Sequence, residues 1–187
     1  MKWSMAILLL LGLVALPAAA ADDWAVYQGP GFSIAYPPGW KVDPAFLDKG
    51  YAFFQGQSDD ARGGIAFSPT TDISPGTNLE SDQLKLVVQR ARPGDLCTAA
   101  AFLVSASPVY ETRRLVDKPE AVRIVAEPGD KYVVEQAVLI VSRTPCIAVH
   151  YYIAYERLTR NDGRHEFDHE QLYKALGVIA GTLKFGP

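Results

Sequence analysis

The sequence has only two cysteines, no long apolar run after residue 16, and little excess charge of either sign. The low net charge and the spacing of the two cysteines each argue against a class of function. The formal net charge of −3 leaves no basic stripe to match a phosphate backbone, so nucleic acid is not an expected partner. Cys97 and Cys146 do not form a C-x-x-C pair, which argues against a thiol redox catalyst.

Familiar catalytic motifs are also scarce. No serine lies in a G-x-S-x-G elbow, and no glycine-rich phosphate loop is present. One short motif does match a known pattern, because residues 165–169 read H-E-x-x-H. In zinc peptidases the two histidines, here His165 and His169, bind the metal, and the glutamate, here Glu166, activates a water molecule.

The sequence around this motif argues against a catalytic metal site. Asp168 has the position of a helix N-cap with Gln171 three residues on, so His165 is expected before the helix instead of on it. A third histidine ligand is missing, because Ala175 occupies the position where longer zincin motifs place one. We therefore expect no catalytic residue, no metal and no cofactor. A surface metal contact at His165 or His169 ranks next, and a metal-dependent hydrolase is the alternative function.

The amino terminus is organised as a secretory signal peptide. A lysine precedes an apolar stretch at 6–16, and a proline and four alanines follow it. The stretch is shorter than the roughly 20 residues that span a bilayer, and an uncleaved anchor is the alternative interpretation. We predict a signal peptide at 1–21, cleaved after Ala20 or Ala21.

The remaining residues, 22–187, have the length of one ordinary domain. They contain no second long apolar segment, so we expect a soluble domain without a membrane span, either periplasmic or secreted. An oxidising compartment predicts a disulfide between Cys97 and Cys146, with two separate buried thiols as the alternative.

Alternating apolar residues bounded by turn residues predict short strands and polar loops. The predicted strands are 32–36, 51–54, 64–67, 121–126, 131–141 and 146–155, and the predicted surface loops are 55–63 and 68–76. Short turns separate the last three strands, so we expect them to form an antiparallel meander. The strand at 146–155 is apolar on both faces, which indicates that both faces of the sheet are covered.

His150 lies inside this last strand, on the same face as Tyr152. It could serve as a ligand or an acid–base group in a pocket. We favour a core histidine with a satisfied hydrogen bond, because no second titratable group lies near it in the sequence.

Two helices are predicted. Thr77 and Glu80 have the spacing of a capping box, and four apolar residues between 84 and 91 share one helical face, so we expect a helix that stops at 93–94. A second helix begins after Asp168. Its apolar stripe is Leu172, Leu176, Ile179 and Leu183. Residues 96–105 fit either a helix or a strand.

The two ends of the domain carry a family resemblance. Residues 31–40 read G-F-S-I-A-Y-P-P-G-W, and a helix leads into T-L-K-F at 182–185. Both ends resemble those of the Mog1/PsbP-like families, which begin with an aromatic strand, a Y-P break and a tryptophan. The resemblance implies an α+β fold, namely an α/β/α sandwich with a central, mainly antiparallel sheet flanked by helices. It implies a binding or assembly module, and the family pattern contains no catalytic residue.

The sequence thus leads to an exported soluble protein-binding or assembly module that is not an enzyme. The expected partner is another envelope protein. The alternatives are the metal-dependent hydrolase and a small-ligand binder with a pocket between the sheet and a helix near His150 and Tyr152.

Overall fold

The computed structural model of the chain describes residues 23–29, 31–43, 64–91, 94, 96–103, 112–128, 130–160 and 162–186. Three predicted features lie outside the described residues: the signal peptide at 1–21, the strand at 51–54 and the loop at 55–63.

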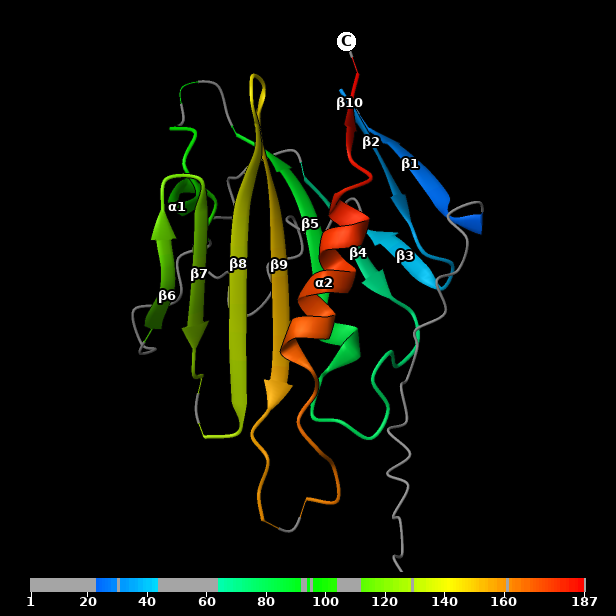
Figure 1. Cartoon of the computed structure of the whole chain (residues 1–187), viewed down its shortest axis with the longest axis vertical. Helices are drawn as coiled ribbons and strands as arrows, with labels where there is room; N and C mark the ends of the chain where they lie inside the picture. Colours follow the sequence, from blue (N-terminus) through cyan, green and yellow to red (C-terminus); the bar gives the residue numbers. More distant parts are fainter. Residues whose placement is uncertain are drawn as a thin grey trace, which may run out of the picture.

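The described chain forms a large and a small antiparallel sheet (Figure 1). The large sheet has seven strands, in the order β3 (Trp40–Asp43), β4 (Gly64–Pro69), β5 (Lys85–Arg90), β9 (Cys146–Glu156), β8 (Tyr132–Arg143), β7 (Ala121–Ala126) and β6 (Thr112–Lys118). The small sheet has three, in the order β1 (Ala25–Gly29), β2 (Phe32–Tyr36) and β10 (Lys184–Phe185). The described helices are α1 (Ala99–Phe102), α2 (His169–Ala180) and a 3₁₀ turn, η3 (Ser81–Gln83).

The expected fold class is wrong. The described residues are mainly β, and the two α-helices among them are short, so within this part of the chain helices do not flank the large sheet as an α/β/α sandwich requires. The error comes from the predicted helix at 77–91, which is instead η3 followed by the strand β5. Thr77 does not cap a helix here, because its hydroxyl donates to the Ser74 carbonyl and accepts from the Leu79 amide.

The helical pattern at 84–91 was misleading because β5 is buried on both faces. It lies between β4 and β9, and its first five residues are all buried. The consecutive apolar residues Leu86, Val87 and Val88 show no alternation that separates a buried strand from a buried helix. Ladder pairing on both edges satisfies the backbone of β5 and decides in favour of the strand.

Most of the other local predictions are confirmed, but Ser68 and Pro69 of the predicted loop at 68–76 belong to β4, and Leu183 of the predicted stripe lies beyond the end of α2. β7, β8 and β9 form the expected meander, and β2 and β4 lie where short strands were predicted. α2 begins at His169, and Asp168 accepts a hydrogen bond from the Gln171 amide at 2.9 Å. The segment 96–105 fitted either a helix or a strand, and its described residues, 96–103, contain the single helical turn α1.

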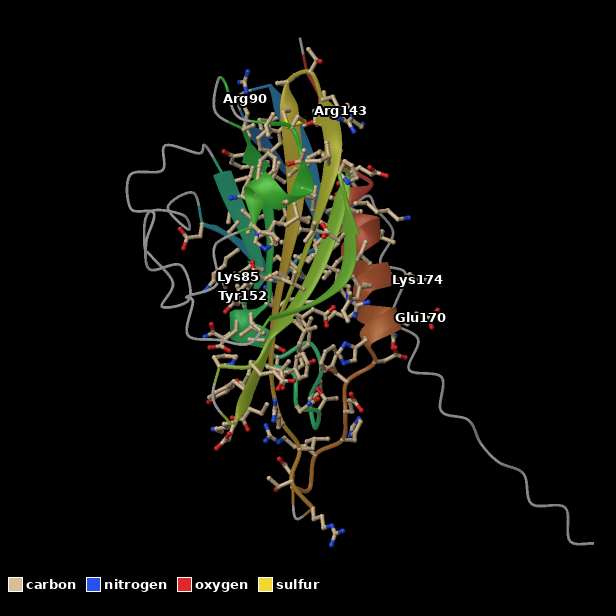
Figure 2. All side chains as sticks on the ribbon, turned by 90° about the vertical axis from the view of Figure 1, so that its left-hand side faces the viewer. Lys85, Arg90, Arg143, Tyr152, Glu170 and Lys174 are labelled. Carbon is tan, nitrogen blue, oxygen red and sulfur yellow. A yellow bond between two sulfur atoms is a disulfide. The ribbon has the colours of Figure 1, made fainter. Side chains whose placement is uncertain are left out.

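The two faces of the large sheet have different covers. The α2 side carries the main core, in which side chains of β4, β5 and β9 pack against α2 and against Ile34 of the small sheet. The opposite face, the α1 side, carries a smaller apolar cluster in which Ala99 and Phe102 of α1 contact β7, β8 and β9. Figure 2 shows Lys85 and Tyr152 on the α1 side, away from Glu170 and Lys174 of α2.

Cys97 and Cys146 form the expected disulfide, with their Cα atoms 5.7 Å apart. The bond ties the segment before α1 to the first residue of β9. No helix in the described part of the chain is long and apolar enough to cross a membrane.

Candidate functional site

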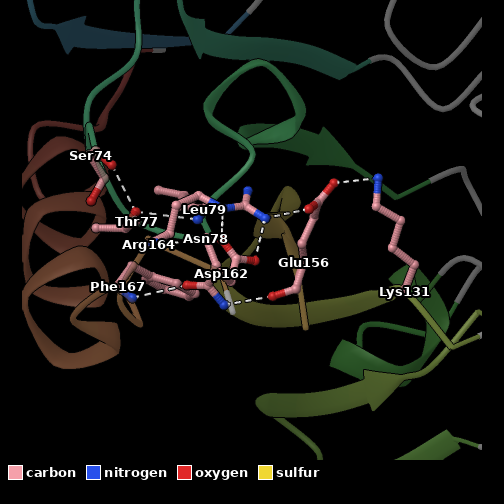
Figure 3. A network of polar contacts seen from close by, with 9 residues as sticks. All are labelled: Ser74, Thr77, Asn78, Leu79, Lys131, Glu156, Asp162, Arg164 and Phe167. Atoms are coloured by element: carbon pink, nitrogen blue, oxygen red, sulfur yellow. Dashed lines mark hydrogen bonds and ion pairs between the residues drawn. The ribbon is translucent and has the colours of Figure 1, made fainter. Parts of the chain in front are cut away.

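A polar network holds the segment that leads into α2 (Figure 3). Glu156, at the end of β9, receives the Arg164 guanidinium at 2.6 Å and the Lys131 ammonium at 2.7 Å. These hydrogen bonds, from Lys131 first and then Arg164, hold the pKa of the Glu156 carboxyl below its usual range. Asn78 completes the network, because its side chain donates to the Glu156 carbonyl and accepts from the Phe167 amide.

This network separates the two histidines of the H-E-x-x-H motif. His165 forms a β-bridge with Thr77, and its amide donates to the Gly76 carbonyl at 3.1 Å. Gly76 has a φ of +78°, a conformation that glycine adopts without strain. His169 is the first residue of α2, so the two histidines do not share one helix as zincin chemistry requires. The sequence prediction for the helix start therefore holds.

His169 instead lies beside a buried carboxylate on β8. Its Nδ1 is 3.6 Å from Oε2 of Glu135, and its Nε2 is 3.6 Å from Oε1 of Glu166. Phe167 and Tyr155 pack against the imidazole ring. Within the described residues, no group of three or more His, Cys, Asp and Glu side chains is arranged to hold a metal ion.

Glu135 is 1% exposed and has several partners from neighbouring elements. Arg123 of β7 forms an ion pair with Oε1, and the hydroxyl of Tyr173, from α2, donates to the same oxygen. Burial, and then this hydrogen bond, raise the pKa of Tyr173 above its ordinary value. The Arg123 guanidinium also lies over the Tyr173 ring, 4.8 Å from its centroid. The cluster anchors the first half of α2 to the meander.

Beyond this cluster the α2 side has a corner that no described element covers. In Figure 1, α2 lies in front of β9 and β5, while no described element lies in front of β6 and β7. The strand register aligns Lys118, Ala121 and Leu139 in one row on this face, next to a row that contains Val116 and Arg123. We call these five residues the open corner.

One large apolar side chain is exposed at the open corner. Leu139 is 39% exposed, although it follows Ala137 on the face that otherwise builds the core. Val116 and Ala121 are half-buried, and Lys118 is exposed. The arrangement is an apolar centre with cationic side chains at its margin. A cluster of this kind, rimmed by polar groups, is typical of a protein interaction site.

His150 lies on the α1 side and is 1% exposed. The expected burial is confirmed, and Nε2 has no hydrogen-bond partner among the described residues. Burial lowers the pKa of His150 to about 4, so its imidazole is neutral at pH 7.

Sequence reasoning missed Glu135 and the open corner. Glu135 left a signal, since a carboxylate within an apolar strand needs a buried partner. The open corner left none, because Leu139 has the same residue type and spacing as the core positions that precede it.

Comparison with known proteins gives similarity in structure alone. No family model and no curated protein matches the chain. The Ran-binding protein Mog1p of Saccharomyces cerevisiae is similar, at 10% identity and a TM-score of 0.46, over 87% of this chain and 95% of that chain. A point mutant of Mog1 aligns at 9% identity and a TM-score of 0.44, over 87% and 96%.

LpqN of Mycobacterium tuberculosis, described as involved in cell envelope biogenesis, is also similar. It aligns at 15% identity and a TM-score of 0.34, over 88% of this chain and 91% of that chain. Two of these three structures are Mog1 proteins.

Proposed function

We propose that this protein is an exported binding or assembly module that docks another envelope protein at the open corner, without catalysis. The single observation that carries the proposal is the exposure of Leu139 on the core-building side of the sheet. An apolar side chain held in a rigid central strand loses little conformational entropy on binding, which favours affinity.

The charges at the corner specify the chemistry of the partner. Lys118 lies in the Leu139 row, and the partly exposed Arg123 lies in the next row. A complementary partner presents an apolar side chain to Leu139 and a carboxylate to Lys118, since Arg123 is already paired with Glu135. Such pairs steer association and fix its register.

A location outside the cytosol fits the chemistry of the two cysteines. A disulfide between Cys97 and Cys146 persists in a periplasmic or extracellular setting and is rare in a reducing cytosol. The separation of His165 from the α2 helix is the reason that a binding role is preferred to a zinc hydrolase.

Leu139→Asp tests this surface. The carboxylate removes the apolar contact and opposes an acidic partner, so recovery of a specific partner from the native envelope should fall at least about tenfold. Val26→Asp is the matched control, because Val26 is 57% exposed but lies on β1 of the small sheet. Quantitative affinity purification of the three proteins measures the difference.

Two results would count against the proposal. Equal recovery of the same partner with Leu139→Asp and with the unchanged protein excludes the open corner. Equal loss with Leu139→Asp and Val26→Asp places the binding surface elsewhere or shows a non-specific effect of charge.

A further inference from the structure

The two ends of the large sheet differ in how their charged side chains are used. The β8–β9 hairpin turns at one end, and β9 finishes at the other, where the chain continues into the segment before α2 (Figure 1). Arg90 of β5 and Arg143 of β8 lie at the first end, as Figure 2 shows. β10 lies there too in Figure 1 and adds Lys184. We call this the hairpin end, and the opposite one the loop end.

Most cations of the loop end are neutralised within the chain. Lys131 and Arg164 are paired with Glu156, and Arg157 is paired with Glu127. The three cations of the hairpin end are also exposed, but none of them forms an ion pair within the part of the chain that the structure describes. The hairpin end therefore keeps a positive charge on a chain whose formal net charge is −3.

Exposed apolar side chains lie at the same end as these unpaired cations. Leu96 is 76% exposed, and the disulfide of the next residue, Cys97, holds it beside the start of β9. Val141 of β8 is 39% exposed, and Phe185 of β10 is 43% exposed. A disulfide and strand pairing already fix the backbone at these positions, so burying the side chains on another surface costs little conformational entropy.

We propose that the hairpin end docks on an anionic lipid bilayer, with its apolar side chains among the lipid head groups and its cations against the lipid phosphates. Apolar side chains combined with lysine and arginine are the features with which peripheral proteins bind such a surface. The proposal goes beyond the protein-binding role at the open corner. The two can fail separately, because lipid vesicles contain no protein partner.

Charge and shape both favour a bilayer as the occupant. A cation close to an anionic membrane contributes about fivefold in affinity, and three unpaired cations are present. The hairpin projects at the end of the molecule in Figure 1. A projecting end covers little area on a rigid partner, whereas a stable protein interface buries about 800 Å² on each side. A deformable lipid surface can close around it.

Co-sedimentation of the exported protein with lipid vesicles tests this surface. The vesicles contain phosphatidylcholine alone, or phosphatidylcholine with an equal amount of phosphatidylglycerol, which supplies negative charge. The protein is purified from the native envelope, so that the predicted cleavage removes the apolar stretch at 6–16, which would add its own lipid affinity. We expect tighter binding to the anionic vesicles, and we expect added salt to weaken that binding by screening.

The double variant Arg90→Gln, Arg143→Gln tests the contribution of charge. Affinity for the anionic vesicles should fall at least about tenfold, because two cations no longer face the lipid phosphates. Arg160→Gln is the matched control. Arg160 is also an exposed arginine, but it follows β9 at the loop end, so its substitution should leave the affinity unchanged.

Leu96→Ser tests the apolar contact. The loss of a leucine that enters the bilayer should weaken binding at least about tenfold. Leu158→Ser is the matched control, because Leu158 is exposed at the loop end. All these substitutions are at exposed positions and should leave the melting temperature unchanged, which separates lost docking from lost folding.

Three results would overturn the proposal. The first is an absence of binding to the anionic vesicles, or equal binding to both kinds of vesicle. The second is an unchanged affinity in the hairpin-end variants, which assigns any lipid binding to another surface. The third is an equal loss of affinity in the loop-end controls, which indicates a general effect of charge or hydrophobicity.

Discussion

Glu135 and Gln136 are adjacent in β8, are buried to a similar degree, and point to opposite faces of the large sheet. On the α2 side, Glu135 is paired with Arg123 and accepts a hydrogen bond from Tyr173. On the α1 side, the side-chain oxygen of Gln136 has no partner. The buried polar side chain of β8 thus has partners on the α2 side, while the oxygen of its neighbour on the α1 side has none among the described residues.

The difference concerns what the buried polar groups of each face contribute to stability. A satisfied buried ion pair specifies how α2 docks on the meander. Unpartnered buried atoms lower the stability of the protein. The α2 side also carries the proposed binding surface at the open corner, which is exposed and apolar instead of buried and polar.

Loss of the disulfide should have the largest effect, and it acts on the α1 side. The two cysteines are 49 residues apart, so the bond constrains the unfolded chain by about 4 kcal/mol. We expect the double variant Cys97→Ala, Cys146→Ala to lose about that much free energy of unfolding, measured by urea denaturation. A loss near zero would show that the α1 side does not depend on this constraint.

Acidification should destabilise the protein through His150. Burial lowers the pKa of His150 to about 4, below the value of about 6.5 in an unfolded chain. The unfolded state therefore binds more protons between these two values, and the free energy of unfolding falls as the pH drops through this window. From pH 7 to about pH 4 the loss assigned to this group is about 3 kcal/mol.

His150→Gln isolates this contribution. The variant lacks the titrating ring, so its unfolding free energy should fall by about 3 kcal/mol less than that of the unchanged protein over the same pH range. Urea denaturation at both pH values gives the comparison. Identical pH dependence in the two proteins would show that His150 is protonated in the folded state as readily as in the unfolded chain.

Replacing the two adjacent residues of β8 gives the smallest effects, and they should have opposite signs. Glu135→Leu leaves Arg123 and Tyr173 without their acceptor and should cost about 2 kcal/mol. Gln136→Leu removes an unpartnered oxygen and should stabilise the free protein by about 1 kcal/mol. Equal destabilisation by both substitutions, measured by urea denaturation, would remove the contrast between the two sides.

Local signals in the sequence were enough to predict the meander and α2. The turns between the three long strands and the cap at Asp168 depend on neighbouring residues, and each lies where it was expected. The strand β5 was mistaken for a helix because its environment is set by β4 and β9, which lie elsewhere in the sequence.

The candidate sites depend still more on tertiary pairing. Arg123, Glu135 and Tyr173 come from three elements, and only the strand register and the docking of α2 bring them together. Gln89 lies diagonal to His150 on one face because β5 and β9 are neighbours in the sheet, although they are distant in the sequence. Residue types alone therefore marked His150 as buried but did not reveal its polar neighbour.

Site-specific photo-crosslinking at position 139 tests the proposed protein-binding role most directly. A photoreactive residue is placed at position 139 or, as the control, at the exposed position 26 on β1, and the protein is irradiated in its native envelope. We predict one discrete protein adduct from position 139 and none from position 26. Absence of an adduct at position 139, or the same adducts from both positions, would contradict the proposal that the open corner docks a partner.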